Sequence, residues 1–385
     1  MVSYDWIVIG GGITGSALAY ELSQRQFKVL LLEKNPLADN ATVYSYGGLA
    51  YWSGTDELTR KLSQEGIELH RNLSEELAGN TEFRELDLVL TIDKEEDPQT
   101  IAQNYNCFAI KPELLDVRQA CELEPLLNPN AIAGALKLPH GHIHPQKTNN
   151  AYQQAFLRGG GEIIFEEVVD LLQEKETIKG VKTNKNSYYA ANTVVCAGGL
   201  TRSLLLETGI KIPNYFTHAQ AILTSPVDIR LRTLVMPAVQ KRFELETEVD
   251  NWDRDSSELV TSILDIGAIQ FLDGRFCLGQ ISGIIPNPLT ELDQKTGENR
   301  IRKGIARILP DLAEIPGTCY HCLVAFNPQD IALVGKLASR DGIYIFSGFT
   351  STLVFSPPLA RRFASWVVNG EDEVIDRLSS KLHPK

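Results

Sequence analysis

The segment DWIVIGGGITGSALAYELSQRQFKVLLLEK, residues 5–34, constrains the fold of this chain more than any other. An apolar run leads into a glycine cluster, a helical pattern follows, and a second apolar run ends on an acid. Within about thirty residues this order predicts a strand, a tight turn, a helix and a parallel second strand, which together form a βαβ unit.

The glycines Gly10, Gly12 and Gly15 occupy the three positions of a G-x-G-x-x-G pattern. The first permits a sharp turn, the second lets backbone approach a pyrophosphate, and the third lets the helix pack on the strand. Glu33 ends the second strand, where an acid accepts hydrogen bonds from a ribose hydroxyl. The unit therefore predicts a dinucleotide site, and the acid argues against NADP.

The choice between NAD and FAD depends on the chain beyond Glu33. A nicotinamide domain continues as one βαβαβ block, whereas here the second strand runs into the hydroxyl- and glycine-rich loop ATVYSYGGLAYWSG, residues 41–54. Clear strand and helix patterns return only after residue 145. This pattern indicates a nucleotide-binding fold that inserted material splits into three segments.

Several motifs follow in a fixed order along the chain. They are LEPLL (123–127), LPHGHIHPQKTNNAYQQAFLRGGGEII (138–164), TVVCAGG (193–199), FLDGRFCLGQ (271–280) and AFNPQDIALVG (325–335). With the opening glycine fingerprint, they make essentially the whole chain resemble the FAD-dependent oxidoreductases of the D-amino-acid oxidase type, which include glycine oxidase and sarcosine oxidase.

The resemblance implies an α/β fold with two domains. A Rossmann-like FAD-binding domain would comprise residues 1–54, 141–215 and 331–385. A discontinuous α+β substrate domain, built on a mostly antiparallel sheet, would comprise residues 55–140 and 216–330. Substrate would lie between this sheet and the flavin.

The resemblance also implies cofactor contacts. Backbone at Gly48 would pass the flavin ring, Thr42 and Ser45 would bind the pyrophosphate, and either Val168 or Val169 would lie near the adenine. The hydroxyls have the alternative of serving as ordinary turn or cap residues. The full set of expected FAD contacts is Gly10, Gly12, Ile13, Thr14, Gly15, Glu33, Lys34, Thr42, Ser45, Gly47, Gly48, Leu49, Val168, Val169, Ala197, Gly198, Gly348, Thr350, Ser351, Thr352 and Leu353.

The loop GFTSTLVFSP, residues 348–357, departs from the family pattern. It is one residue shorter than is usual and lacks a second glycine, which weakens the contacts assigned to Ser351, Thr352 and Leu353. It also lacks the cysteine to which sarcosine-oxidase relatives attach flavin, so we expect FAD to bind non-covalently.

The substrate pocket departs from the family further. Amino-acid-oxidising relatives hold the substrate carboxylate with an arginine, whose planar fork meets both oxygens. Asn327 stands at that position here, and Ser351 stands where glycine-oxidase relatives place another arginine. Losing one partner of a buried charge pair typically costs about 2–5 kcal/mol, so a simple α-amino acid is a poor substrate candidate.

Other side chains are candidates for the pocket. His218 either faces the substrate or packs beneath the flavin domain, and Tyr46, like Tyr51 and Trp52, either lines the pocket or belongs to the core. Lys241 and Arg242 are weaker candidates, because the acids that follow them are more typical of a solvated face.

Two further patterns invite a metal or redox interpretation. His140, His142 and His144 alternate by two, but they fall in the proline-bounded motif, so structural roles are favoured over a metal site. Cys319 and Cys322 form a C-x-x-C within a predicted strand. Residues three apart in a strand point to opposite faces, which favours core thiols over a disulfide or metal pair.

The amino-acid composition limits which classes of partner and compartment are expected. A formal charge of −12 disfavours nucleic acid, and six cysteines in 385 residues are too few for a disulfide framework. The first apolar run contains Asp5 and follows no basic region, so we interpret it as a strand rather than a signal peptide. We expect a cytoplasmic protein with a small-molecule substrate and without a transmembrane segment.

Three functions remain open. The first is FAD-dependent oxidation of a C–N bond in a small amine or modified amino acid, by hydride transfer to flavin N5, with oxygen or a carrier as electron acceptor. The second is an FAD-bound assembly or binding factor that has lost catalysis, which the missing arginines favour. The third is a flavin dehydrogenase of a non-amine substrate such as a hydroxy acid. No catalytic residue is assigned.

Overall fold

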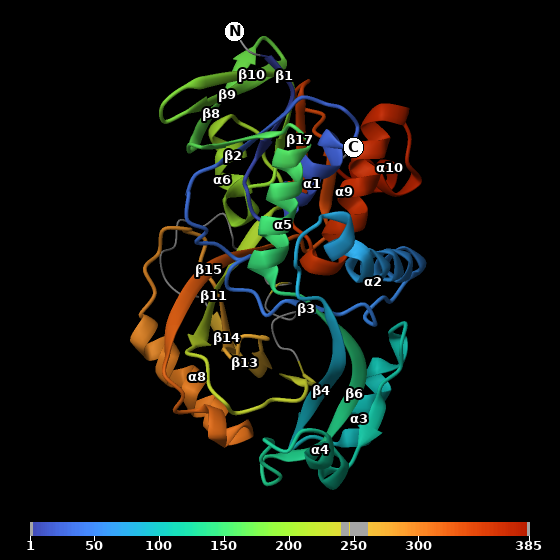
Figure 1. Cartoon of the computed structure of the whole chain (residues 1–385), viewed down its shortest axis with the longest axis vertical. Helices are drawn as coiled ribbons and strands as arrows, with labels where there is room; N and C mark the ends of the chain where they lie inside the picture. Colours follow the sequence, from blue (N-terminus) through green and yellow to red (C-terminus); the bar gives the residue numbers. More distant parts are fainter. Residues whose placement is uncertain (1–2, 240–245, 247–260, 383–385) are drawn as a thin grey trace.

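The computed structural model describes residues 3–239, 246 and 261–382. The chain forms two β-sheets, which Figure 1 shows one above the other, with both chain ends in the upper half. The upper half holds β1, β10, β17 and the helices α1, α9 and α10, and the lower half holds β4, β6, α3, α4 and α8. This arrangement confirms the predicted α/β fold with a second, discontinuous part.

The first sheet has eight strands, in the order β16-β17-β10-β1-β2-β7, with β9 and β8 added beside β10. The pairs β10–β1, β1–β2, β2–β7 and β10–β17 are parallel, as a Rossmann-like sheet requires. The strands are β1 (Ser3–Ile9), β2 (Val29–Glu33), β7 (Glu162–Phe165), β8 (Val168–Glu174), β9 (Thr177–Thr183), β10 (Ser187–Val195), β16 (Leu333–Lys336) and β17 (Ile343–Ser347).

Helices cover this sheet because its strands are apolar on both faces. Along β1, Trp6 and Val8 belong to one core cluster, whereas Ile7 and Ile9 belong to another on the opposite face. The helices of this half are α1 (Ile13–Ser23), α2 (Glu57–Glu76), α5 (Pro145–Arg158), α6 (Thr201–Glu207), α9 (Thr352–Asn369) and α10 (Glu373–Ser380), with the 3-10 turn η2 (Gly198–Leu200).

The second sheet has nine strands, in the order β15-β11-β14-β13-β12-β4-β6-β3, with β5 beside β6. Its neighbours are antiparallel except for β12 and β4, which are parallel, so the sheet is mixed but mostly antiparallel. The strands are β3 (Gly48–Leu49), β4 (Arg84–Asp93), β5 (Glu113–Leu115), β6 (Ile132–His142), β11 (Tyr215–Thr224), β12 (Leu234–Pro237), β13 (Thr261–Gln270), β14 (Phe276–Ile284) and β15 (Gly317–Phe326).

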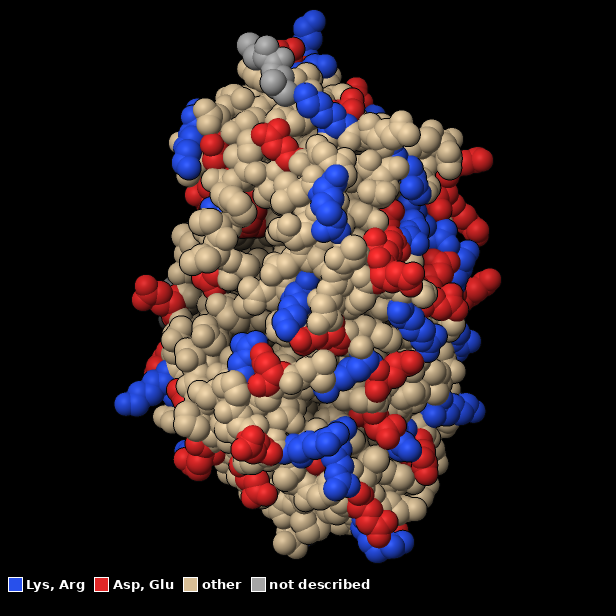
Figure 2. Space-filling model, in the orientation of Figure 1, with Lys and Arg blue, Asp and Glu red and all other residues tan. Residues whose placement is uncertain are grey.

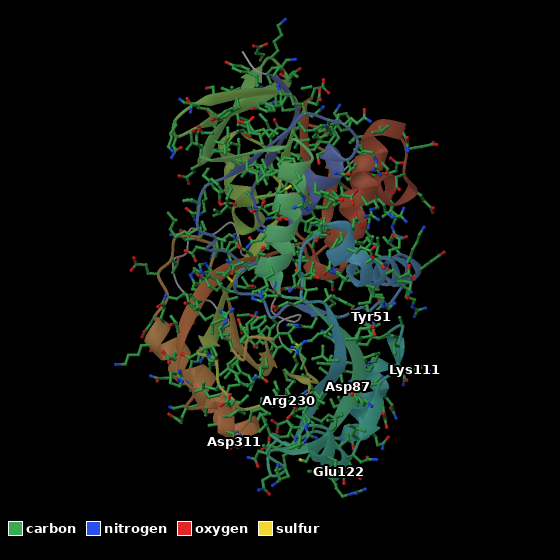
Figure 3. All side chains as sticks on the ribbon, viewed as in Figure 1. Tyr51, Asp87, Lys111, Glu122, Arg230 and Asp311 are labelled. Atoms are coloured by element: carbon green, nitrogen blue, oxygen red, sulfur yellow. The ribbon has the colours of Figure 1, made fainter. Side chains whose placement is uncertain are left out.

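Short helices close the outer side of the second sheet. They are α3 (Pro98–Asn104), α4 (Val117–Leu123) and α8 (Gln294–Ile308), with the 3-10 turns η1 (Tyr105–Cys107) and η4 (Pro310–Leu312). The labelled side chains of Glu122, Arg230 and Asp311 lie at this end of the molecule, far from β1 and α1 (Figure 3).

Two elements cross the boundary expected near residue 54. Strand β3 precedes it but pairs with β6 of the second sheet. Helix α2 follows it but packs on α9, where a Cβ at Gly66 would lie 2.2 Å from the carbonyl oxygen of Val354. The domain ranges given above therefore stay a prediction.

Charges of both signs are interspersed over the face shown in Figure 2. Within residues 3–239 and 261–382, no helix combines the length and the apolar character needed to cross a membrane.

Candidate active site

Two adjoining cavities lie where the two sheets meet. The first cavity, about 470 Å³, is bounded by the glycine turn after β1, the end of β2, the segment after β10 and the loop after β17. The second cavity, about 800 Å³, is bounded by the loop around Gly48, the second sheet and the start of α9. They share lining residues, namely Ile13, Ala41, Thr42, Cys322, Val324, Phe349 and Thr352. A single elongated ligand can therefore extend from one into the other.

The glycine turn is shaped by close backbone contacts. Gly10 has φ +107°, and a Cβ there would lie 2.5 Å from the carbonyl oxygen of Cys196. A Cβ at Gly15 would lie 1.9 Å from the carbonyl oxygen of Gly10, so α1 packs directly on the turn. Both positions exclude any side chain. The N-terminus of α1 consequently faces the first cavity, where Gly12, Ile13 and Thr14 line it.

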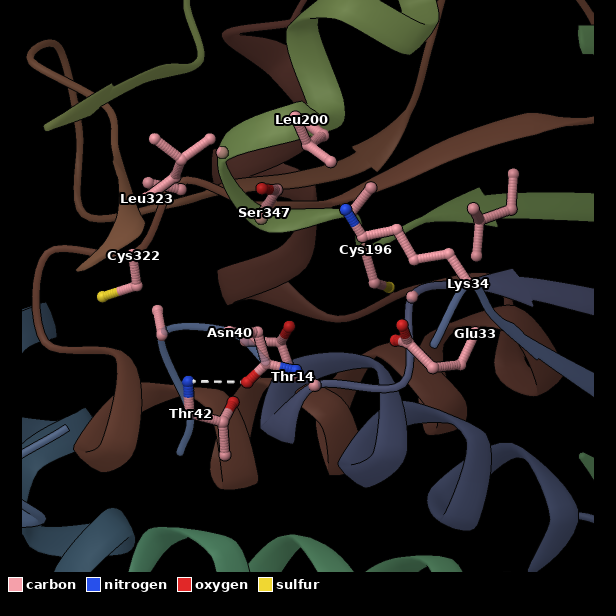
Figure 4. Close-up of a pocket in the computed structure, with 18 of the residues that line it drawn as sticks. Thr14, Glu33, Lys34, Asn40, Thr42, Cys196, Leu200, Cys322, Leu323 and Ser347 are labelled. Atoms are coloured by element: carbon pink, nitrogen blue, oxygen red, sulfur yellow. Dashed lines mark hydrogen bonds between the residues drawn. The ribbon is translucent and has the colours of Figure 1, made fainter. Parts of the chain in front are cut away.

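Glu33 lies on the wall of the first cavity at the end of β2. Its Oε2 accepts the N–H of Gly11 over 2.7 Å, and its Oε1 accepts the N–H of Asn35 over 3.1 Å. Figure 4 shows Glu33, Thr14 and Thr42 on one side of this cavity, and Leu200, Leu323 and Ser347 on the other. The two backbone bonds fix the carboxylate at the end of the cavity where a ribose hydroxyl is expected.

The two predicted pyrophosphate hydroxyls have backbone partners. Thr42 Oγ1 accepts the N–H of Ile13 over 3.1 Å, and Ser45 Oγ accepts the N–H of Gly47 over 3.2 Å. Thr42 itself is held by Asn40, whose Oδ1 accepts the Thr42 N–H over 3.0 Å, as the dashed line in Figure 4 shows. Thr42 lines both cavities and Ser45 the second, so their contact with a pyrophosphate stays a prediction.

The remaining predicted contacts of the first cavity lie on its wall. Lys34, Val168, Ala197, Gly198 and Gly348 all line it. The alternative to Val168, Val169, points away and is 40% exposed. Of the two valines, Val168 is therefore the one placed to contact an adenine, and that contact stays a prediction.

Three further residues predicted to contact FAD do not line either cavity and instead shape the backbone around it. Gly15 packs α1 on the turn, as described above. Gly47 has φ +76°, and a Cβ there would lie 2.1 Å from the carbonyl oxygen of Ile143. The side chain of Leu49 is fully buried in the core, against Gly141. None of the three lines either cavity.

Asn327 does not lie in the substrate cavity, contrary to the prediction from its place in the motif. It is 3% exposed and lines neither cavity. Its Oδ1 accepts the N–H of Gln329 over 3.1 Å, and its Cβ lies 3.3 Å from the Cβ position of Gly348. The side chain stabilises the turn that leads to Pro328 and supports the loop after β17.

His218 is buried and is likewise absent from both cavity walls. Its Nε2 lies 3.1 Å from the carbonyl oxygen of Asn287, and its Nδ1 lies 2.8 Å from Nε2 of His321. The two rings are 5° from parallel, with centroids 4.9 Å apart. His321 in turn lines the first cavity.

The second cavity contains the other predicted pocket residues. Tyr46 and Gly48 line one part of it. The start of α9 and the loop before it line another part, through Thr350, Ser351, Thr352 and Leu353. A Cβ at Gly48 would lie 2.8 Å from Nε2 of His140 and 3.5 Å from the Leu234 side chain. Burial raises the pKa of Tyr46 well above its ordinary value, so this phenol stays neutral.

His140 is a cavity residue that the sequence pattern left with a purely structural role. Its Nδ1 lies 3.1 Å from Nε1 of Trp52, and an indole N–H only donates, so the neutral ring carries its proton on Nε2. Burial lowers the pKa of His140 to about 3. A neutral N–H donor therefore lies beside Gly48 on the cavity wall.

The neighbouring histidines have structural partners. Nε2 of His142 lies 3.0 Å from the carbonyl oxygen of Tyr46, and His144 caps the N-terminus of α5. Among the residues that the structure describes, no group of three His, Cys, Asp or Glu side chains is placed to hold a metal ion.

The C-x-x-C pair lies in a strand with its members on opposite faces, as predicted, but the expectation of two core thiols holds for Cys319 and is wrong for Cys322. Cys319 is buried in a core cluster of the second sheet, whereas Cys322 lines both cavities. Neither forms a disulfide. The candidates Lys241 and Arg242 lie outside the described residues.

Several residues that line the second cavity were not site candidates from the sequence. Tyr105 and Phe108 come from η1 and the residues after it, Asp265 comes from β13, and Gln280 ends the motif 271–280 within β14. They are far apart in sequence, and no spacing rule connects them with Gly48. Only the tertiary arrangement of η1 and the second sheet places them around one cavity.

Comparison with known proteins agrees with this geometry. The family model described as "FAD dependent oxidoreductase" matches residues 5–366. The 4-methylaminobutanoate oxidase (formaldehyde-forming) of Paenarthrobacter nicotinovorans is 24% identical over 381 residues, which cover 94% of this chain and 43% of that protein. Human mitochondrial dimethylglycine dehydrogenase is 26% identical over 229 residues, covering 58% of this chain and 26% of that protein.

Solved structures show the same fold. Glycine oxidase from Geobacillus kaustophilus superposes with a TM-score of 0.82 at 19% identity, with all of both chains covered. L-proline dehydrogenase from P. horikoshii superposes with a TM-score of 0.77 at 21% identity, covering 98% of this chain and 96% of that one. The chain spans less than half the length of the first curated relatives it matches. With a matching model over nearly its whole length and the glycine turn and Glu33 in place, the chain belongs to the FAD-dependent oxidoreductase family of the D-amino-acid oxidase type.

Proposed function

We propose that this protein uses FAD to oxidise a C–N bond of a small amine or modified amino acid. The observation that supports it is the continuity of the two cavities. One presents the glycine turn and Glu33, and the other presents Gly48 among mostly apolar and aromatic side chains. The glycine turn and the N-terminus of α1 in the first cavity would suit a dinucleotide, and the second cavity would give a flat ring a place beside the backbone of Gly48.

Different parts of FAD would lie in the two cavities. Gly10 to Thr14 and the α1 N-terminus would hold the pyrophosphate, Glu33 the ribose, and Val168, Ala197 and Gly198 the adenosine portion. Gly48 and the loop Thr350–Leu353 would hold the ring. The positive end of α9 begins in that loop and favours negative charge on the reduced ring.

Bound FAD would supply the hydride acceptor at N5, and the chain's own contribution is positioning and electrostatics. His140 and Tyr46 stay neutral at the cavity wall because burial disfavours their charged forms. The second cavity would bring an amine carbon against the ring, and its aromatic side chains would exclude water. The imine product then hydrolyses without a dedicated acid or base.

The electron acceptor is oxygen or a carrier. Relatives with this fold are named both oxidase and dehydrogenase. Two alternative functions have relatives of their own. A 210-residue stretch, 51% of this chain, is 30% identical to an anaerobic glycerol-3-phosphate dehydrogenase subunit of Escherichia coli. A mouse pyruvate dehydrogenase phosphatase regulatory subunit is 26% identical over 374 residues.

One experiment separates the three. The purified yellow protein is mixed anaerobically with amines, D- and L-amino acids and hydroxy acids, and bleaching of the visible flavin band is recorded. Bleaching by amines supports the proposal. Bleaching by hydroxy acids alone contradicts it, and a flavin reduced by dithionite but by no panel member favours the binding-factor alternative.

A further inference from the structure

Two prolines interrupt the first turns of α9, the helix that begins at the second cavity. Pro357 and Pro358 lie inside this helix and carry no backbone N–H. In an α-helix each N–H bonds the carbonyl oxygen four residues earlier, so the carbonyl oxygens of Leu353 and Val354 have no helical donor. Both residues are buried and line the second cavity. Because buried carbonyl oxygens require a partner, another element has to meet them.

Helix α2 meets both carbonyl oxygens from one of its faces. Nε2 of His70 lies 2.7 Å from the carbonyl oxygen of Leu353. One turn earlier, the bare backbone of Gly66 leaves room for the carbonyl oxygen of Val354, which would lie 2.2 Å from a Cβ there. Residues four apart share a helix face, so α2 is matched to two consecutive carbonyl groups of α9. Figure 1 shows α2 beside α9.

His70 is a neutral donor in this contact. A carbonyl oxygen only accepts, so the proton of the imidazole is on Nε2. The side chain is fully buried, and this burial lowers the pKa of His70 to about 4. At neutral pH the donor is therefore present and carries no charge.

Ion pairs hold the two helices together farther along α9. Arg362 of α9 donates to both carboxylate oxygens of Glu65 of α2, over 2.5 and 3.1 Å. Arg361 donates to Glu76 of α2 over 2.6 Å. These pairs fix the later turns of α9 against α2, whereas His70 acts on its first turn.

The first turn of α9 also carries the amide groups that border the expected position of the flavin ring. Thr352 and Leu353 begin the helix and line the second cavity, and the first N–H groups of a helix have no partner within it. The N–H and the carbonyl of a helical residue point in opposite directions along the axis. A donor that binds the Leu353 carbonyl oxygen therefore also fixes the direction of its N–H.

We propose that His70 is a positioning residue for the flavin, which holds the first turn of α9 so that its N–H groups stabilise the reduced ring. The inference adds a residue to the proposed function and rests on it only for the place of the ring beside α9. The positive end of a helix favours negative charge, so a well-placed first turn raises the reduction potential. His70 itself lines neither cavity and acts through Leu353.

The test is the midpoint potential of the FAD-bound protein, measured without substrate by reduction in the presence of a reference dye. His70→Leu removes the donor. It is expected to lower the preference for reduced over oxidised flavin about fivefold, which lowers the two-electron potential by about 20 mV. His70→Gln, whose longer amide can still donate to the Leu353 carbonyl oxygen, is expected to keep the potential of the unchanged protein. An unchanged potential in His70→Leu, or an equal loss in His70→Gln, would overturn the inference.

Two further variants separate positioning from a general loss of stability. Leu73→Ala removes a buried side chain from the same helix, outside both cavities, so it should lower the free energy of unfolding and leave the potential unchanged. Pro357→Ala supplies an N–H that can bond the Leu353 carbonyl oxygen within α9, so it should restore most of the potential lost in His70→Leu. A potential that falls in Leu73→Ala, or that Pro357→Ala does not restore, would leave His70 a structural role alone.

His70→Asn keeps the test decisive if His70→Leu does not fold. Its amide is one methylene shorter than that of glutamine, so it falls short of the Leu353 carbonyl oxygen and should lower the potential in the same direction. Equal potentials in the Asn and Gln variants would contradict the inference.

The amine panel is recorded separately from the potential. A flavin that no amine reduces contradicts the proposed function and leaves the effect of His70 on the potential standing. A potential that does not respond to His70→Leu contradicts the inference and leaves C–N oxidation standing.

Discussion

Trp52 and His140 form a hydrogen bond that sets the character of the second cavity. The Nε1–H of Trp52 donates to Nδ1 of His140 over 3.1 Å. His140 lies in β6, next to Gly141. The proton of the neutral imidazole is consequently on Nε2, toward the cavity and Gly48. Because burial lowers the pKa of His140 to about 3, the ring remains a neutral donor across physiological pH.

Trp52→Phe is expected to remove the hydrogen bond that holds the His140 imidazole in its Nε2–H tautomer. The loss of a buried hydrogen bond should lower the free energy of unfolding by about 1–2 kcal/mol, and the bound flavin spectrum should shift because Nε2 no longer has to carry the proton. The matched control is Trp366→Phe, which removes an indole bond to Asp376 of 2.8 Å, outside both cavities. A spectral shift of equal size in both variants would show that His140 does not face the cofactor.

Gly48→Ala is expected to disturb the cavity wall beside the ring of the cofactor, because the buried His140 ring must move to accommodate the new methyl. The new methyl would lie 2.8 Å from Nε2 of His140 and occupy space on the cavity wall. We expect FAD affinity to fall at least about tenfold. Gly159→Ala serves as control, since the nearest atom to its Cβ is at 3.4 Å. Unchanged FAD binding in Gly48→Ala would place the ring elsewhere.

Glu33→Gln is expected to weaken FAD binding without unfolding the chain. The amide keeps an oxygen for the Gly11 N–H, now 2.7 Å from Oε2, but it loses the bond from the Asn35 N–H and the charge that strengthens the bond to a ribose hydroxyl. The expected rise in the Kd of FAD is about tenfold, measured by fluorescence of released flavin. Glu174→Gln, on an exposed position of β8, controls for the loss of one surface charge.

Asn327→Arg and Ser351→Arg are expected to have opposite results. Asn327 is buried outside both cavities, so an arginine there should destabilise the protein and give no new reduction by glycine or sarcosine. Ser351 lines the second cavity and its side chain does not cap α9, so an arginine there places a cation within reach of a carboxylate. We expect it to lower the Kd of phenylacetate about tenfold. Glycine oxidation gained by Asn327→Arg would contradict the placement of that side chain.

Stability should fall on mild acidification because of buried neutral histidines. Burial lowers the pKa of His70 to about 4 and those of His140 and His142 to about 3. Between about pH 6.5 and about pH 4 the unfolded chain therefore binds protons that the folded chain does not. Each of these histidines therefore lowers the free energy of unfolding as the pH falls through that window.

Denaturant unfolding at several pH values checks this slope. His70→Gln, whose amide can still donate to the Leu353 carbonyl oxygen now 2.7 Å from Nε2, should flatten it. The carboxylates with lowered pKa, such as Asp56 beside Thr59, act in a different window, since their stabilisation is lost only below about pH 4. A slope above that pH that His70→Gln leaves unchanged would exclude His70 as its source.

The sequence by itself determined the nucleotide half of the protein. The glycine spacing, the two apolar runs and Glu33 are local features, and the βαβ unit, the α1 N-terminus and the position of Glu33 follow from them because parallel strands and helix ends have fixed geometry. The strand around Cys319 and Cys322, with its thiols on opposite faces, follows equally from local alternation.

Only the tertiary structure decided the second cavity. Its wall combines Trp52, Tyr105, His140 and Asp265 from separate elements, and no local period relates them. Asn327 shows the converse, since a motif position was matched correctly but the turn directed its side chain into the protein. A fingerprint is read from neighbours along one chain segment, whereas a substrate cavity depends on strand pairing between distant segments, which sequence spacing does not encode.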